Sequence, residues 1–260
     1  MLQTKIARIA LLISFLLVFT MWIAHLVNLA FDLDLYRYGI LPQTASGLIG
    51  IIAAPFIHST ADFGHILNNS LPAFVLTWLL FYHYRTIALQ VFVIIYLVTG
   101  TAMWLLARDS YHIGMSGVIY GLTSFLVFSG FFRKNMRVAA VSLFVIFLYG
   151  SLVWGIFPTA VNISWEGHAL GFFAGLIVAV LYKYSGPQPQ KMRYELEEEF
   201  GIEPENEYWK EETIISVEST SEPVGTGRDL SNPEDLSNPE EQKKPESNVQ
   251  IQYHYKPKSE

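Results

Sequence analysis

Apolar residues are gathered into six long stretches that contain no Asp, Glu, Lys or Arg. The stretches cover residues 9–31, 63–84, 86–107, 110–132, 138–165 and 167–182. Five of them exceed 20 residues, which is enough for a helix rising about 1.5 Å per residue to cross about 30 Å of hydrocarbon. The sixth has 16 residues and fits a span with little tilt or a locally thinned bilayer. The pattern predicts an all-α polytopic membrane protein with a bundle of six transmembrane helices.

The composition supports this class and excludes others. Hydrophobic residues make up 52% of the chain, and the mean hydropathy is +0.32, both typical of a protein in a lipid bilayer. The absence of cysteine excludes thiol chemistry and a cysteine-based metal site. Basic residues form no concentrated face, so no nucleic-acid partner is expected. The first apolar stretch is too long for a signal peptide and lacks a clear cleavage site, so we interpret it as a retained anchor.

The chain changes character after the last apolar stretch. Residues 1–185 carry nine basic and five acidic residues, whereas residues 186–260 carry eight basic and eighteen acidic ones. The second part also repeats Asp-Leu-Ser-Asn-Pro-Glu at 229–234 and 235–240. Such a composition cannot bury enough apolar surface to offset the entropy of ordering. We therefore predict a membrane domain over 1–185 and an acidic, Pro/Ser-rich, mostly disordered tail over 186–260. The tail either binds an unknown partner or only aids solubility.

The charges in the membrane domain predict its orientation. Most basic residues fall on one side of a six-span arrangement, and most acidic ones fall on the other, with Arg37 and Arg108 as exceptions. The positive-inside rule then places both termini in the cytoplasm, and the plasma (inner) membrane of a bacterium is the favoured location. The connection between residues 32 and 62 becomes external. Its apolar piece, 48–56, is too short for a span and is interpreted as an interfacial element.

Polar residues recur near the external ends of the even-numbered spans. His65 and Asn69 begin the second, Ser116 begins the fourth and His168 begins the sixth. Three separate segments therefore bring polar side chains to one membrane depth, where ionisable groups are costly and usually functional. Each has a structural alternative, because a serine can bond to a carbonyl one turn back, and His65 with Asn69 can cap a helix.

Glycines beside Ser116 and His168 suggest how the spans meet. They are Gly114, Gly117 and Gly121 in the fourth stretch and Gly167, Gly171 and Gly175 in the sixth. Small residues at this spacing let two membrane helices approach closely. Contact between these faces would place His168 near Ser116.

The chemistry that these residues suit is nucleophilic catalysis. A serine hydroxyl is unreactive until a base takes its proton, and His168 could be that base. Tyr120, one turn after Ser116, could pack against the imidazole in place of a third, acidic member. Glu166 is expected to point away from His168, so the sequence supports a dyad. His65 and Asn69, spaced i, i+4, suit an oxyanion site, and without a third ligand they argue against a metal.

Three motifs together resemble a known family. Gly114-Met115-Ser116-Gly117 with Tyr120 resembles the Gly-x-Ser-Gly motif of rhomboid intramembrane serine proteases. His65 to Asn69 is similar to their His-x-x-x-Asn segment, and Gly167-His168-Ala169-Leu170-Gly171 to their last-helix Gly/Ala-His-x-x-Gly motif. The resemblance covers roughly residues 1–185. Family members often carry a Trp-Arg pair in the first loop, whereas here Arg37 lies between two tyrosines.

The resemblance implies both a fold and a reaction. The fold would be the six-helix rhomboid bundle, with Ser116 as nucleophile, His168 as general base, and His65, Asn69 and the Ser116 amide binding the oxyanion. The substrate would be a transmembrane segment of another membrane protein, cleaved near its external end, and no cofactor or metal is expected. An inactive relative that binds transmembrane helices is the first alternative, and an unrelated channel or transporter is the second. The second lacks support because no repeated halves are visible.

Overall fold

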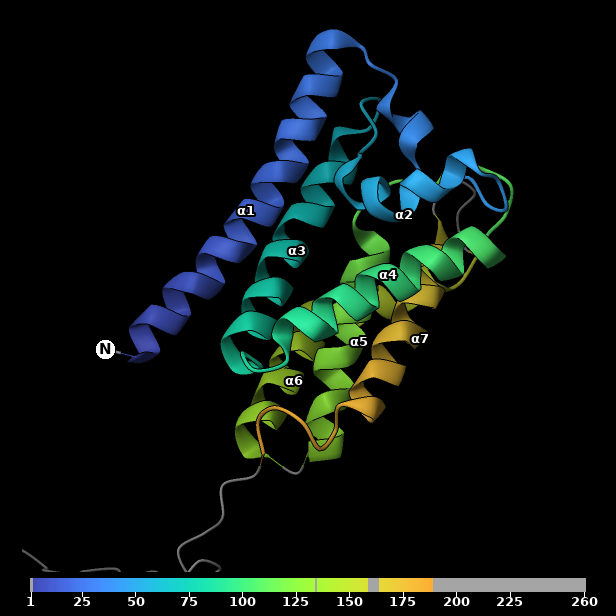
Figure 1. Ribbon diagram of the computed structural model, residues 1–260. Helices are drawn as coiled ribbons and strands as arrows, with labels where there is room; N and C mark the ends of the chain where they lie inside the picture. Colours follow the sequence, from blue (N-terminus) through green and yellow to red (C-terminus); the bar gives the residue numbers. More distant parts are fainter. Residues whose placement is uncertain (1, 134, 159–163, 189–260) are drawn as a thin grey trace, which may run out of the picture. The chain divides into compact units, whose positions relative to one another are not determined.

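The computed structural model describes residues 2–133, 135–158 and 164–188. Within these residues the chain is helical, with no strand beyond one isolated bridge. Its long helices are α1 (Leu2–Phe31), α3 (Phe63–His83), α4 (Ala88–Leu106), α5 (Ser116–Arg133), α6 (Met136–Tyr149) and α7 (Trp165–Leu181), shown in Figure 1. The predicted all-α class is confirmed. The predicted tail lies outside the described residues from position 189 onward.

Not every long helix meets the requirements of a membrane span. Four segments in the described part are long and apolar enough: Gln3–Phe31, Ala88–Leu106, Ser116–Arg133 and Met136–Ile156. The last joins α6 to a 3₁₀ segment, η4 (Gly150–Ile156). Helix α3 carries polar residues in its first half, and α7 has only 17 residues. The number of crossings therefore stays a prediction.

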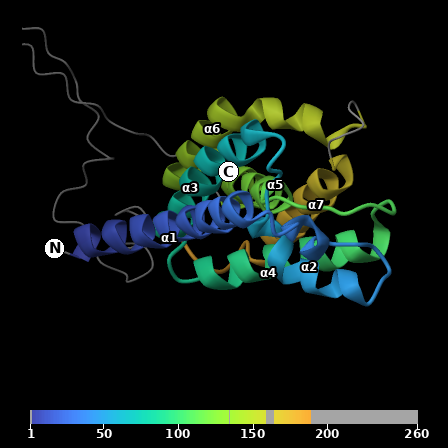
Figure 2. The same ribbon diagram turned by 90° about the horizontal axis from the view of Figure 1, so that it is seen from above.

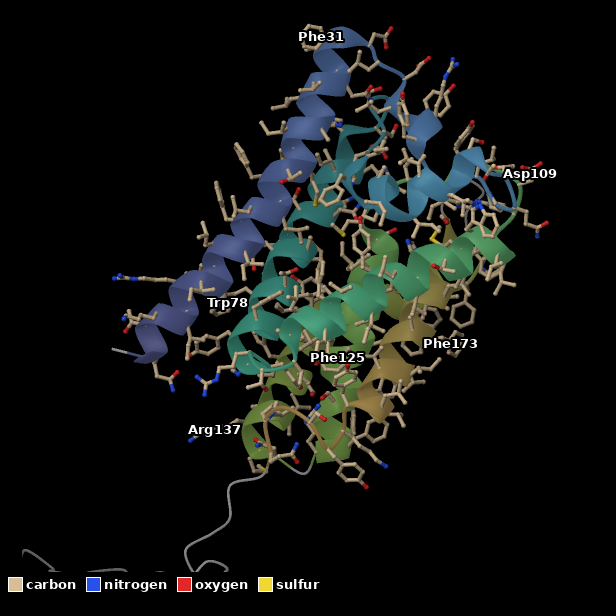
Figure 3. The ribbon with its side chains drawn as sticks, in the orientation of Figure 1. Phe31, Trp78, Asp109, Phe125, Arg137 and Phe173 are labelled. Atoms are coloured by element: carbon tan, nitrogen blue, oxygen red, sulfur yellow. The ribbon has the colours of Figure 1, made fainter. Side chains whose placement is uncertain are left out.

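Helix α5 forms the centre of the described bundle. Viewed from above, it is enclosed by α3, α4, α6 and α7 (Figure 2). Within the apolar 18-residue window of each helix, 61% of α5 is buried, against 22% of α1, which packs mainly against α3. The shared core contains Leu76, Ile95, Phe125, Val145 and Val178, each from a different helix. Phe125 lies inside, whereas Phe173 points outward (Figure 3). A serine at the start of α5 is thereby held in the most enclosed element.

Glycines bring α5 and α7 into backbone contact. A methyl group added to Gly171 would lie 2.0 Å from the carbonyl oxygen of Gly117, and one added to Gly175 would lie 2.0 Å from that of Gly121. The predicted contact of these two glycine faces is confirmed. Gly114 belongs to neither face, because it precedes α5 in the loop and has φ +104°. We refer to this α5–α7 contact as the glycine seam.

The long connection before α3 is built of short helical turns. They are η1 (Leu35–Tyr38), η2 (Ser46–Ile49), α2 (Gly50–Ala53) and η3 (Ala54–Phe56). The connection is tied to the rest by main-chain hydrogen bonds. Ile40 and His112 exchange two bonds of 2.9 Å, and the Gly114 amide donates to the Ala54 carbonyl at 2.8 Å. The connection therefore braces the loop that leads into α5. Its placement at a membrane interface stays a prediction.

A buried arginine closes the other end of the α5–α7 pair. Arg133 is the last residue of α5 and is 3% exposed. Its Nε donates to Ser129 Oγ at 2.6 Å, and its Nη2 donates to the Tyr182 carbonyl at 2.5 Å. Nη1 donates to the Ser185 carbonyl, and the guanidinium lies over the Tyr84 ring at 5.4 Å. Its charge is thus surrounded by acceptors, as a buried charge requires.

Candidate active site

The polar ends of three helices surround one cavity of about 700 Å³. The wall from α3 contains His65 and Asn69, that from α5 contains Ser116 and Tyr120, and that from α7 contains His168. The five residues come from three segments far apart in the sequence. Their convergence follows from packing α3 and α7 on either side of α5. The structure therefore brings together the residues proposed for catalysis and for the oxyanion site.

Ser116 occupies the first position of α5 and is half-buried. The first amides of a helix have no partner within the helix and point toward the positive end of its dipole. The approach to this position depends on Gly114, whose positive φ is unfavourable for residues with a side chain. A methyl group on Gly114 would also lie 2.6 Å from His65 Nε2. The loop of residues 107–115 that leads to Ser116, referred to below as the serine loop, is therefore in close contact with His65.

His168 lies in the first turns of α7 and is 9% exposed. Its Nδ1 is 2.9 Å from the carbonyl oxygen of Gly155. Since a carbonyl only accepts, Nδ1 carries the proton and Nε2 has a free lone pair. The Tyr120 ring stacks on the imidazole, with centroids 4.1 Å apart and planes at 6°. This is the packing that the helical spacing led us to expect.

Ser116 and His168 flank the glycine seam. Ser116 directly precedes Gly117, and His168 directly follows Gly167. A methyl group on Gly117 would lie 3.2 Å from the Gly167 carbonyl oxygen. Among the described residues, no hydrogen bond joins the Ser116 hydroxyl to the imidazole. Catalytic hydrogen bonds are often long until substrate is bound, so the shared cavity and the free lone pair are the informative features.

Asn69 and His65 are linked along one face of α3. The Asn69 side-chain amide donates to the His65 carbonyl at 2.7 Å, and Asn69 is buried. An amide NH₂ has two hydrogens, so one remains for a group in the cavity. The start of α3 is capped by Asp62, whose carboxylate accepts from the Gly64 amide at 2.9 Å. The cap holds the start of α3, and the i, i+4 bond holds the Asn69 side chain in place.

Two further histidines are buried next to the cavity. His58 is 1% exposed and lies 5.0 Å, ring to ring, from His65. Burial lowers the pKa of His58 to about 3, so its ring is neutral at physiological pH. His112, 3% exposed, has Nδ1 2.7 Å from Ser164 Oγ and Nε2 3.0 Å from the Arg108 carbonyl. Nothing in the local sequence distinguishes either from an exposed loop histidine.

The rim of the cavity carries an ion pair. Arg108 Nε lies 3.5 Å from Glu166 Oε1, and the glutamate is 9% exposed. Glu166 thus pairs across the rim with Arg108, which leads from α4 toward the serine loop. The pair joins this loop to the first turn of α7, as the His112–Ser164 bond also does. Both contacts help to fix Ser116 relative to His168.

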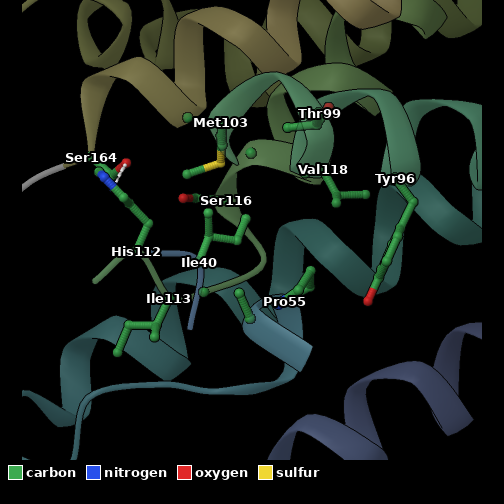
Figure 4. A pocket seen from close by; sticks show the side chains of 15 residues that line it. Ile40, Pro55, Tyr96, Thr99, Met103, His112, Ile113, Ser116, Val118 and Ser164 are labelled. Carbon is green, nitrogen blue, oxygen red and sulfur yellow. Dashed lines mark hydrogen bonds between the residues drawn. The ribbon is translucent and has the colours of Figure 1, made fainter. Parts of the chain in front are cut away.

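A second, smaller cavity lies behind Ser116. Its volume of about 20 Å³ is close to the space needed by one water molecule. Its lining includes Thr99, Met103 and Ser164, which Figure 4 shows around Ser116 together with the bond from His112 to Ser164. Ser116 therefore borders both cavities.

A family model and one named relative indicate the same family. A family model of the Rhomboid domain matches residues 45–185. An uncharacterized protein of Mycobacterium tuberculosis is 32% identical over 159 residues, which are 58% of this chain and 65% of the relative. An uncharacterized protein of Mycobacterium leprae is 31% identical over 151 residues, 54% of this chain and 58% of the relative. The chain thus spans less than two thirds of the length of these relatives. A "Putative rhomboid protein" of Acanthamoeba polyphaga mimivirus is 30% identical over 149 residues, 54% of this chain and 78% of the relative.

Proposed function

The chain belongs to the rhomboid family, and on that premise we propose that it is an intramembrane serine endopeptidase. The observation that carries the proposal is the state of His168. Its Nδ1 hydrogen is held by the Gly155 carbonyl, so Nε2 is available as a base in the cavity that Ser116 lines. A serine and a neutral imidazole in one cavity are the minimum that nucleophilic acyl transfer needs.

The reaction follows from these two groups. His168 Nε2 takes the hydroxyl proton of Ser116 as Oγ attacks the scissile carbonyl, and a tetrahedral oxyanion forms. The imidazolium then gives its proton to the departing amine, which leaves an ester on Ser116. A water molecule attacks the ester while His168 again accepts the proton. His168 returns this proton to Ser116 Oγ as the C–O bond of the ester breaks, so Ser116 is regenerated, and the second product leaves as a carboxylic acid that ionises to a carboxylate.

The oxyanion is stabilised by donors from two helices. The Ser116 amide lies at the N terminus of α5, and the free hydrogen of the Asn69 amide and the His65 ring face the cavity from α3. Donors held in place before the reaction stabilise the developing charge without reorganisation. Gly114 allows His65 to approach the serine loop closely. This gives Gly114 and Gly117 supporting roles, the first at the oxyanion site and the second at the seam.

The substrate is a transmembrane segment of another membrane protein, cleaved near its external end. The family and the apolar helices support a multi-pass membrane protein; six spans, cytoplasmic termini and a bacterial plasma membrane belong to the proposal. The polar groups that line the cavity bring water and hydrogen-bond donors to a depth where a substrate helix is otherwise protected by lipid. Residues 186–260 are proposed as a separate cytoplasmic tail.

Activity-based labelling tests the proposal. A fluorophosphonate should label the detergent-solubilised wild type, and Ser116→Ala and His168→Ala should lose both labelling and cleavage of a single-span substrate. Ser59→Ala is the matched control, because Ser59 lines the same cavity and has no assigned role; it should label normally. Cleavage retained in Ser116→Ala contradicts the mechanism. A folded wild type that neither labels nor cleaves favours the alternative, an inactive rhomboid-like protein that binds transmembrane helices.

A further inference from the structure

The hydrogen-bond acceptor of His168 comes from an element that the three motifs do not include. Gly155 lies in η4, the segment that continues α6, and is 13 residues from His168 along the chain. The carbonyl of Gly155 is 2.9 Å from Nδ1. In a serine–histidine–carboxylate triad this position belongs to the carboxylate, which fixes the tautomer and the ring orientation. Here a main-chain carbonyl occupies it.

The absence of a side chain at position 155 is required by two neighbours. A methyl group on Gly155 would lie 1.9 Å from the Tyr120 hydroxyl oxygen and 3.2 Å from His168 Nδ1. The first distance is far below van der Waals contact, and the second demands a small shift. Tyr120 and His168 are themselves stacked at 4.1 Å. Any side chain at 155 would therefore separate the carbonyl from the imidazole or push the tyrosine off it.

We propose that Gly155 is a positioning residue of the active site, the third member that completes the Ser116–His168 pair. Its carbonyl keeps the proton of His168 on Nδ1, and its missing side chain lets Tyr120 cover the imidazole face. This inference rests on the proposed function for its effect on rate. The tautomer of His168 is independent of it and can be measured in a protein that cleaves nothing.

The segment that carries Gly155 is lightly packed. None of the residues of η4 is fully buried, whereas α5 and α7 contribute many buried residues. Leu152 from the same segment lines the large cavity. The base is thus oriented by a wall of the cavity that belongs to neither catalytic helix, so α6 and η4 must be in place for Nε2 to face Ser116.

A set of three variants tests the role of Gly155. Gly155→Ala should reduce cleavage by at least about 10²-fold, within the range that loss of an orienting partner produces. Gly150→Ala is the matched control in the same segment, because its methyl group meets only Ile146 at an ordinary 3.7 Å, and it should stay within about threefold. Adding Tyr120→Phe to Gly155→Ala removes the oxygen in the closest contact. The double variant should recover at least about tenfold relative to Gly155→Ala, which a general folding defect would not do.

Nitrogen NMR of ¹⁵N-histidine-labelled protein reports the tautomer directly. The wild type should show a protonated Nδ1 and a pyridine-type Nε2 for His168, assigned by loss of the signals in His168→Gln. Gly155→Ala should lose this pattern, and the double variant should regain it in part. A wild-type His168 protonated on Nε2, wild-type activity in Gly155→Ala, or no recovery in the double variant would overturn the role of Gly155. If the NMR spectra show the expected tautomers but the protein has no activity, the role of Gly155 in holding the tautomer stands and only the proposed protease function is contradicted.

Discussion

Polar groups at the two ends of the α5–α7 pair differ in how fully they are hydrogen-bonded. At one end, Arg133 is buried and donates to Ser129 and to the carbonyls of Tyr182 and Ser185. At the other end, Ser116 and His168 border a cavity of about 700 Å³, and the imidazole has one nitrogen bonded and the other free. The same two helices, joined by one glycine seam, carry both arrangements.

The difference separates a structural polar group from one suited to chemistry. A buried charge without partners is very costly, so Arg133 is stable only because neighbouring acceptors surround it. A base, by contrast, needs a lone pair that is not already occupied. Burial alone does not distinguish the proposed active end, because Arg133 is more deeply buried than His168. The free hydrogen-bonding capacity at the cavity end does.

The largest expected effect is at the cavity end and concerns rate. His65→Ala should reduce kcat/KM for a single-span substrate by about 10²–10³, since it removes one oxyanion donor, with little change in thermal unfolding. Asn68→Ala is the control, because Asn68 lines the same cavity but is exposed. It should stay within about threefold of wild type. Equal activities for the two variants would remove His65 from the oxyanion site.

The next effect lies in the seam that joins the two ends. Gly171→Ala should lower the free energy of unfolding by about 3 kcal/mol, because its methyl group would lie 2.0 Å from a main-chain oxygen of α5. Activity should fall with it, since Ser116 and His168 are held together by this contact. Thermal unfolding in detergent measures the loss, with Gly150→Ala as the tolerated glycine substitution. Wild-type stability in Gly171→Ala would contradict the close approach of the helices.

The smallest effect is at the arginine end and concerns stability alone. Arg133→Gln should cost about 2 kcal/mol, the range for hydrogen bonds made by a charged group, yet leave fluorophosphonate labelling intact at low temperature. Arg137→Gln makes the same charge change at an exposed position and should be neutral within about 0.5 kcal/mol. Loss of labelling in folded Arg133→Gln would contradict the claim that Arg133 contributes to stability alone.

Most of the fold was accessible from the sequence because lipid imposes a simple requirement. Stretches without charges predict helices, and each of the six predicted stretches overlaps one of the long helices. The residues at which the helices begin and end were less predictable. The stretch 110–132 contains a loop before Ser116, and 138–165 contains the end of α6, η4 and the start of α7. Uncharged turns at these ends leave no mark in the charge pattern.

The residues of the candidate site could be predicted from the sequence, but the buried residues that surround them could not. Ser116, His168, His65 and Asn69 are distinctive because polar side chains are rare in apolar stretches. Nothing in the sequence marks His58 and His112 as part of the site, yet both are buried beside the cavity. Their burial depends on how the long connection before α3 folds over the ends of α4 and α5, which is a long-range contact that local sequence does not encode.

The sequence by itself determined the helical class, the glycines of the seam and the polar residues of the candidate site, since periodicity and polarity are properties of side chains. Only the tertiary structure decided which partner holds each of them. Gly155 is the clearest case, because it acts through a carbonyl that every residue possesses and through a side chain that it lacks. Its contact with His168 exists only where η4, α5 and α7 meet, so no local pattern could reveal it.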